Sequence, residues 1–240
     1  MYLLKLFVQN ADQAIRNAEL NDKLLQKEKL SAVGQVMGMV MHDLRCPIKN
    51  IKLLNNMLRE EIGNNELIDT IDQSAEQASE IFDDFLDFIN NTPVEKNPLN
   101  LNEIAAEAVK LSQSREDTTH TVIKLNIPAD LIVRGDESKL RRTISNLVNN
   151  AVDVLQGKKG GEINISANVI DNMAVLNISD NGPGIPPEIL NTLFDPFVTK
   201  SKSTGTGLGL AIVKQYVNAH GGNITVKNNN GAVFTISLPL

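Results

Sequence analysis

Apolar residues recur at helical spacing through the first ninety residues of the chain. Between residues 37 and 62 they follow at steps of three and four, which at about 100° per residue gives one helical stripe. A second such stripe runs from Ile68 to Ile89, after turn residues at 63–65. Two long helices joined by a short turn predict an antiparallel hairpin. Since one hairpin cannot bury both stripes, we expect a homodimer that forms a four-helix bundle. The first stripe comprises Met37, Val40, Met41, Leu44, Ile48, Ile51, Leu58 and Ile62.

A looser repeat precedes the hairpin. Apolar residues recur every seven positions from Leu4 to Met39, which predicts a coiled-coil lead-in over residues 1–30. Polar residues at Asn21 and Glu28 interrupt the repeat, so a merely amphipathic helix remains an alternative. The predicted hairpin domain then covers residues 31–92.

The period of the pattern changes after residue 92. Two prolines and little apolar content mark residues 93–98 as a linker. Beyond it, the spacing predicts helices over 101–111, 137–155 and 208–220, and alternation predicts strands over 121–127, 131–133, 162–170, 173–180, 224–226 and 233–238. Helices with mostly antiparallel strands predict an α/β sandwich over residues 99–240, with helices on one face of the sheet. The fold class is therefore α+β.

Composition narrows the classes of partner. The net charge of -6 and the absence of tryptophan argue against a nucleic-acid partner. The single cysteine excludes an internal disulfide and suits a reducing compartment. The apolar run from Leu3 to Val8, broken by Lys5, is too short to span a bilayer. We therefore expect a cytoplasmic chain without a membrane span, although the parent protein could be membrane-attached.

One histidine, His42, lies on the face of the first helix opposite the apolar stripe. Cys46 is one turn further along the same face, and Pro47 crowds the carbonyl of Asp43, which predicts a kink beside the histidine. Neutral imidazole is a competent nucleophile near pH 7, and Asp43 could accept its other N–H. His42 and Asp43 are therefore the candidate catalytic pair.

Four polar or glycine-rich motifs in the second domain point to a phosphate ligand. A carboxylate at the end of a strand, Asp180, could accept a hydrogen bond from an amine such as adenine N6, and the glycines after it allow close backbone approach. The glycine-rich segment 205–209 opens into a helix, whose free amides could bind phosphates. Asn146 and Asn150 share one helix face, and an amide oxygen can hold Mg²⁺. The segment 194–204, polar after its two phenylalanines, has the character of a mobile lid whose cations could reach a triphosphate. The candidate nucleotide-binding residues are Asn146, Asn150 (also the metal ligand), Asp180, Gly182, Gly184, Lys200, Gly205, Thr206, Gly207, Leu208 and Gly209.

These motifs, in this order, resemble those of sensor histidine kinases. Segments 146–151, 180–184, 194–197 and 205–209 look like the N, G1, F and G2 boxes of that family, and segment 42–47 resembles its H box. The resemblance covers residues 31–240. It implies a dimerisation and phosphotransfer hairpin followed by a Bergerat-type ATP-binding domain, with ATP and Mg²⁺ as cofactors. It further implies a protein-histidine kinase of two-component signal transduction, which phosphorylates His42 and passes the phosphoryl group to an aspartate in the receiver domain of a separate response regulator.

The chain departs from the family at two positions. Cys46 replaces a common threonine or asparagine, and because a thiol holds water poorly we expect weak phosphatase activity. A redox thiol and a small residue that fills the kink are the alternatives. Asp153 stands where many members carry a basic residue, so Lys200 or Arg142 would have to compensate.

Two other functions remain as alternatives, namely a Bergerat-fold ATPase and a non-catalytic nucleotide-binding dimer scaffold. ATPase relatives carry a glutamate where this chain has Asn146, an amide without useful basicity, so hydrolysis lacks its general base. The remaining histidines, His120 and His220, are interpreted as structural, and His220 suits the negative end of a helix dipole.

Overall fold

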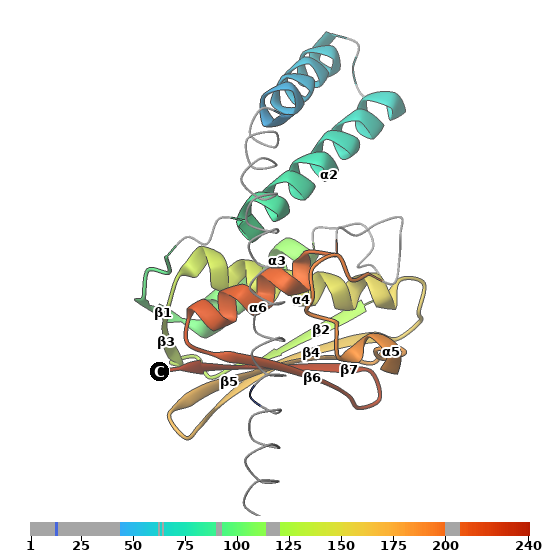
Figure 1. Cartoon of the computed structure of the whole chain (residues 1–240). Coiled ribbons are helices and arrows are strands. Elements are labelled where there is room, and N and C mark those ends of the chain that lie inside the picture. The colour runs from blue at the N-terminus through green and yellow to red at the C-terminus, as the bar shows by residue number, and fades with distance from the viewer. Residues whose placement is uncertain are drawn as a thin grey trace, which may run out of the picture. The chain divides into compact units, whose positions relative to one another are not determined.

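The computed structural model describes residues 44–61, 65–89, 93–113, 121–199 and 207–240, together with the single residues 13 and 63. It forms two compact units, residues 1–90 and 91–240, which Figure 1 shows. Apart from residue 13, the coiled-coil lead-in predicted over residues 1–30 lies outside the described residues. Within the described part, no helix is both long and apolar enough to cross a membrane.

The first unit contains the predicted helical hairpin. The helix over residues 44–61 runs antiparallel to α2 (Glu66–Ile89), because contacts between them pair its start with the end of α2 (Figure 1). Gly63 has a φ of 77° and its N–H donates to the carbonyl of Arg59 at 3.0 Å, which ends the first helix. Asn65 Oδ1 accepts the N–H of Leu67 at 2.9 Å and caps the start of α2.

Ion pairs and one buried hydrogen bond join the two hairpin helices. Arg45 pairs with Asp83, and Arg59 lies 2.8 Å from Asp69 and 2.6 Å from Asp72. Asn55 is only 1% exposed and donates to the carbonyl of Ile68 at 2.7 Å. Exposed ion pairs contribute only about 0–1 kcal/mol each. These contacts therefore fix the register of the hairpin more than they stabilise it.

The second unit is a layer of helices on a five-stranded sheet. Helices α3 (Leu101–Gln113), α4 (Glu137–Leu155) and α6 (Gly209–Ala219) cover one face (Figure 1). The strand order is β2-β4-β5-β7-β6; β2 pairs with β4 in parallel and the other pairs are antiparallel. The strands are β2 (Thr121–Asn126), β4 (Gly161–Ile170), β5 (Met173–Asp180), β6 (Asn223–Asn228) and β7 (Ala232–Pro239). The predicted sandwich is confirmed.

Local signals in the sequence explain most of these elements. Asp136 caps α4 by accepting the N–H of Lys139 at 3.2 Å. Asp171 and Asn172 have φ values of 48° and 61°, as a tight hairpin turn between β4 and β5 requires. Burial alternates along β5 and β7, and their inward side chains pack under the helices. This core includes Leu101, Ile144, Leu147, Ile163, Ile165, Leu176, Ile178, Val213 and Ile236.

A two-stranded sheet and a short helix complete the unit. Strand β1 (Asn97–Asn100) was not predicted and includes Asn97 and Pro98, which belong to the predicted linker. It pairs antiparallel with β3 (Ile132–Gly135), the short strand predicted over 131–133. The short helix α5 (Pro187–Leu190) follows the loop after β5.

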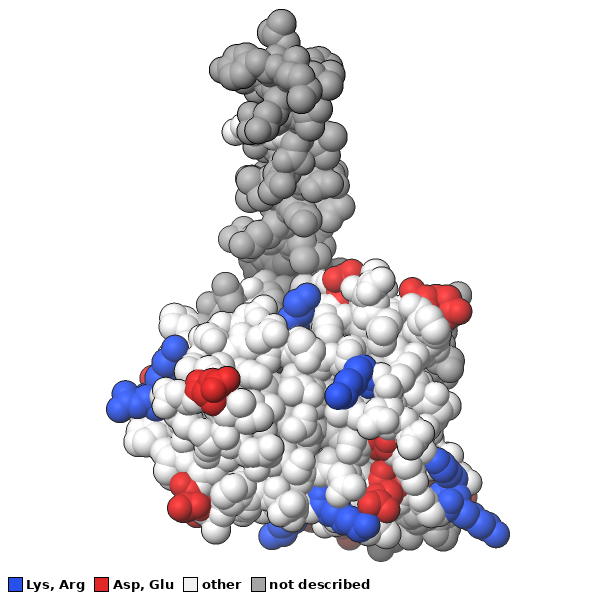
Figure 2. All heavy atoms as spheres, turned by 90° about the horizontal axis from the view of Figure 1, so that it is seen from below, with Lys and Arg blue, Asp and Glu red and all other residues white. Residues whose placement is uncertain are grey.

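The uncovered face of the sheet is polar but carries few charges. Asn164 lies opposite Ser179 and Ser166 opposite Asn177 in the β4–β5 pair, and Thr235 donates to Asn177 Oδ1 at 2.8 Å. Figure 2 views this face, where lysine and arginine are scattered among acidic residues. On this face the basic side chains form no stripe of the kind that follows a nucleic-acid backbone.

Candidate nucleotide site and phosphoacceptor helix

Asp180 ends β5 with its carboxylate fixed on one side only. Its Oδ1 accepts the N–H of Gly182 at 2.7 Å and that of Ala232 at 3.3 Å, whereas its Oδ2 has no hydrogen-bond partner among the described residues. A Cβ on Gly182 would lie 2.7 Å from Asp180 Oδ1 and 2.8 Å from the Val154 side chain, so glycine is needed there. The half-buried carboxylate is therefore held in one orientation and presents one open acceptor.

The loop that follows Asp180 is fastened to the start of β4. The Oδ1 of Asn181 accepts the N–H of Glu162 at 3.0 Å, and its Nδ2 donates to the carbonyl of Gly160 at 2.9 Å. The Asn181 N–H also donates to the Glu162 carbonyl at 3.1 Å. Sequence reasoning missed this role of Asn181, because its partners lie about twenty residues away and no spacing rule connects them.

Helix α4 carries both candidate asparagines and brings one of them, Asn146, to the start of α6. Both Asn146 and Asn150 are half-buried. The Nδ2 of Asn146 lies 3.4 Å from the carbonyl of Gly209 and donates to it, while Asn150 has no hydrogen-bond partner among the described residues. Gly209 is the first residue of α6, where backbone N–H groups and the positive end of the helix dipole favour an anion. The structure thus places Asn146 beside Gly209, and the nucleotide-binding roles of Asn146, Asn150 and Gly209 stay predictions.

The two ends of the segment between Phe197 and Gly207 meet. The N–H of Phe197 donates to the carbonyl of Gly207 at 2.9 Å, and a Cβ on Gly207 would lie 2.7 Å from the carbonyl carbon of Phe197. Gly207 has a φ of 68°, which glycine adopts without strain. The site residues Lys200, Gly205 and Thr206 lie outside the described residues, whereas Gly184, Leu208 and Gly209 lie within them.

The phosphoacceptor candidates lie at the edge of what is described. His42 and Asp43 are outside the described residues, and the described helix begins at residue 44. Cys46 is exposed on this helix, and the helix continues through Pro47. The site assignments of His42 and Asp43 therefore stay predictions.

The donor set suits a nucleotide with its metal ion. One carboxylate oxygen of Asp180 is open to accept a hydrogen bond from an amine. The amide of Asn150, which none of the described residues pairs with, offers the hard oxygen that Mg²⁺ accepts. The N-terminus of α6 can receive phosphate oxygens. Fold and site together define an ATP-binding domain of the Bergerat type that follows a helical hairpin.

Comparisons with known proteins identify the family. Residues 135–240 match the family model described as "Histidine kinase-, DNA gyrase B-, and HSP90-like ATPase", and residues 32–91 match "His Kinase A (phospho-acceptor) domain". The sensor histidine kinase ZraS of Salmonella typhimurium is 32% identical over 236 residues, which cover 92% of this chain and 49% of ZraS. Sporulation kinase D of Bacillus subtilis is 28% identical over 94% of this chain and 45% of its own length. The chain thus spans about half the length of these relatives.

Solved structures agree with this assignment. A mycobacterial sensor histidine kinase, MprB, is 31% identical, with a TM-score of 0.55 over 60% of this chain and 97% of that chain. Full-length ShkA in complex with AMPPNP shares the fold at 22% identity, with a TM-score of 0.70 over 85% of this chain and 45% of that one. The chain belongs to the sensor histidine kinases of two-component systems, whose enzyme class is protein-histidine kinase. The phospho-acceptor family model and the relatives, which are named as histidine or sporulation kinases, do not favour an ATPase or a non-catalytic scaffold. The match to the ATPase family model supports the use of ATP.

Proposed function

We propose that this chain uses ATP and Mg²⁺ to phosphorylate its own His42 and passes the phosphoryl group to an aspartate in the receiver domain of a separate response regulator. The observation that carries the proposal is the half-fixed carboxylate of Asp180, with one oxygen tied by Gly182 and Ala232 and the other open. Asp180 lies in a domain that follows a helical hairpin, and the hairpin matches the phospho-acceptor family model.

The nucleotide would be held at three points. Asp180 Oδ2 would accept the adenine amine, and the glycines at 182 and 184 would let the base approach the backbone. Asn146 would contact the phosphates, together with Gly207 and Leu208 just before α6 and Gly209 at its first position. Lys200, Gly205 and Thr206 are proposed to contribute from the neighbouring segment. Asn150 would bind Mg²⁺, which supplies charge neutralisation to the phosphates when it is bound.

His42 would act as the nucleophile. A nitrogen of its neutral imidazole attacks the γ-phosphorus, the bond to the β-phosphate oxygen breaks, and ADP leaves. Asp43 would accept the N–H of the other ring nitrogen and stabilise the positive charge that develops on the ring. An aspartate carboxylate of the regulator then displaces the histidine and takes the phosphoryl group.

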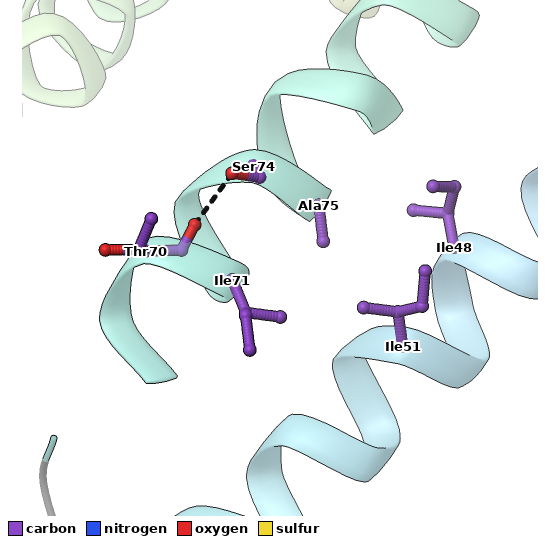
Figure 3. A pocket seen from close by; sticks show the side chains of 6 residues that line it. All are labelled: Ile48, Ile51, Thr70, Ile71, Ser74 and Ala75. Carbon is purple, nitrogen blue, oxygen red and sulfur yellow. Dashed lines mark hydrogen bonds between the residues drawn. The ribbon is translucent and has the colours of Figure 1, made fainter. Parts of the chain in front are cut away.

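A homodimer is proposed through the hairpin. Two isoleucines of the first helix, Ile48 and Ile51, face Ile71 and Ala75 of α2 across an apolar groove of about 300 Å³ (Figure 3). Burying an isoleucine fully stabilises by about 1.5–3 kcal/mol, and the hairpin's own polar contact supplies little. A second copy of the hairpin is the cover that we propose. The large apolar side chains that remain exposed on the hairpin are Leu44, Ile51, Leu53, Leu54, Met57, Leu58, Leu67, Ile71 and Ile81.

The division of the chain into functional parts is also proposed. Residues 1–30 would be a coiled-coil lead-in, 31–92 the dimerisation and phosphotransfer domain, 93–98 a linker and 99–240 the catalytic domain. The separation of the described chain into two units at residues 90 and 91 supports a boundary close to the linker. The chain is proposed to act in the cytoplasm.

The experiment that tests this function is incubation of the chain with γ-labelled ATP and Mg²⁺. The protein is expected to acquire an acid-labile, alkali-stable label, as phosphohistidine does. Asn150→Ala is expected to abolish labelling because the Mg²⁺ ligand is lost, while Asn164→Ala, an exposed asparagine on the uncovered sheet face, serves as control. A wild-type chain that acquires no label, or only an acid-stable one, would overturn the proposal.

A further inference from the structure

We propose that Asn228 is a positioning residue for nucleotide binding, because the turn between β6 and β7 clamps the loop at residues 181–185. The turn, residues 228–232, is far from that loop in sequence but touches both of its ends. This inference rests on the proposed binding of ATP at Asp180 and assigns a role to residues outside the motifs described above.

The far end of the loop is held by one side chain. Asn228 Oδ1 accepts the N–H of Ile185 at 2.9 Å, and Asn228 Nδ2 donates to the carbonyl of the same residue at 2.8 Å. One amide therefore satisfies both backbone groups of Ile185, as a neighbouring strand would. Gly184 has a φ of 76°, and a Cβ on it would lie 2.9 Å from Asn228 Oδ1. The loop thus passes directly against the Asn228 amide.

The near end of the loop is held by the backbone of the same turn. The N–H of Ala232 donates to Asp180 Oδ1 at 3.3 Å. Gly231 has a φ of 139°, and a Cβ on it would overlap the carbonyl oxygen of Asp180. The turn can approach Asp180 this closely only because residue 231 is glycine. The orientation of the adenine-reading carboxylate and the path of the loop are therefore set by one turn.

Holding the loop in place before the nucleotide binds lowers the entropic cost of binding. Each backbone residue that becomes fixed costs about 1–2 kcal/mol, and a preorganised loop avoids that cost at the moment of binding. The proposed scheme gives Asn228 no role in the reaction of His42 or at the phosphate-binding end of α6. Its loss should therefore weaken ATP binding without slowing the reaction of bound ATP, which is the kinetic pattern of lost uniform binding.

The matched pair of variants is Asn228→Ala and Asn229→Ala in the full chain. Both delete an amide from the same turn, but the contact that Asn229 makes is through its backbone, whose N–H donates to the Gly231 carbonyl at 2.9 Å. The Kd for Mg-ATP is measured by calorimetry. The KM for ATP and the maximal rate are measured from autophosphorylation, and melting temperature reports folding.

For Asn228→Ala we expect Kd and KM to rise roughly ten-fold, from two hydrogen bonds of typical net strength, with the maximal rate within two-fold of wild type. Asn229→Ala should match wild type. Asn228→Ser, whose hydroxyl can replace one of the two hydrogen bonds, should fall between them. An unchanged KM in Asn228→Ala and in Asn228→Ser, or a fall in maximal rate with KM unchanged, would overturn the inference. Failure of the wild-type chain to bind ATP would instead overturn the proposed function.

Discussion

His220 provides a test of how the catalytic domain is held together at the end of α6. The side chain is fully buried; its Nε2 accepts the N–H of Asp136 at 3.0 Å, and its Nδ1 lies 2.7 Å from the carbonyl oxygen of Tyr216. Because the Asp136 N–H can only donate, Nε2 carries no hydrogen, and Nδ1 must donate to Tyr216. Burial lowers the pKa of His220. The structural role expected for His220 is thus supported, but by a neutral imidazole that joins α6 to α4 rather than by a charge at the helix dipole.

Replacing His220 by alanine should destabilise the catalytic domain strongly. The change leaves the Asp136 N–H without its partner, at about 1–3 kcal/mol, whereas the Tyr216 carbonyl keeps the backbone N–H of residue 220 at 3.1 Å. It also leaves a cavity beside Gly135, where a Cβ would already lie 2.8 Å from the ring. We expect a loss of about 3–5 kcal/mol, which lowers the melting temperature by roughly 6–20 °C for a domain of this size. His220→Gln, which keeps one donor and one acceptor, should lose less.

The same geometry predicts how stability depends on pH. An unfolded histidine titrates near pH 6.5, and His220 in the fold titrates lower. Above about pH 6.5 the contribution of His220 to stability is fully present. As pH falls below 6.5 the unfolded state binds the proton first, so the free energy of unfolding decreases until the pH reaches the pKa of His220 in the fold. The slope from this one group is at most about 1.4 kcal/mol per pH unit.

Asp136 causes a second loss of stability, at lower pH. Burial raises its pKa, but hydrogen bonds from the Ser138 hydroxyl and the Lys139 N–H outweigh that effect, and the net pKa is lowered from 3.8. Its contribution is therefore present above about pH 4 and is lost as pH falls through the folded pKa. Denaturant unfolding at pH 7.5, 6.5 and 5.5 isolates the histidine step, since the other histidines cancel between wild type and His220→Gln. A variant whose stability falls in parallel with wild type over this range would refute the neutral-imidazole reasoning.

Three further predictions concern dimerisation, recognition of adenine by Asp180 and phosphatase activity. Ile51→Glu, at a groove residue that is 41% exposed, should weaken dimerisation at least roughly ten-fold by sedimentation because each substitution counts twice, whereas Asn56→Glu, at an exposed polar residue of the same helix, should not; equal dimers in both would contradict the proposed interface. Asp180→Asn keeps the acceptor for Gly182 but loses a charge-assisted acceptor for the adenine amine, so Mg-ATP should bind about ten- to a hundred-fold more weakly by calorimetry; unchanged affinity would remove Asp180 from the site. Cys46→Thr should dephosphorylate a labelled regulator faster in reducing buffer, since a hydroxyl orients water better than a thiol; equal rates would reject the weak-phosphatase interpretation.

Local signals in the sequence were sufficient to predict most of the helices and strands of the catalytic domain. The bounds of α4 and its Asp136 cap follow from helical periodicity and capping chemistry, and the turn at Asp171 and Asn172 follows from its sequence. Strand β1 could not be predicted, because it is four residues long, contains a proline and is defined only by its partner β3.

Long-range contacts limited the prediction of the site. The sequence predicted Asp180, Asn146 and Gly209 as site residues, because glycine and amide spacing is typical of that chemistry, and the structure places Asn146 beside Gly209. It did not identify Asn181 or Asn228, whose side chains act on backbone groups 19 and 43 residues away. Nor did it predict the ion pairs and the Asn55 hydrogen bond that join the two hairpin helices, since helical periodicity finds an apolar stripe but not the polar side chains beside it.

The central claim is that His42 receives the γ-phosphoryl group of ATP, and the direct measurement is the site of the label in the wild-type chain and in His42→Gln. The wild-type label should be acid-labile and alkali-stable and should map by mass spectrometry to the peptide that contains His42. His42→Gln should bind Mg-ATP with wild-type affinity, because the nucleotide site lies in the other domain, and should acquire no label. A His42→Gln chain that labels as strongly as wild type, or a wild-type label on another residue, would contradict the account.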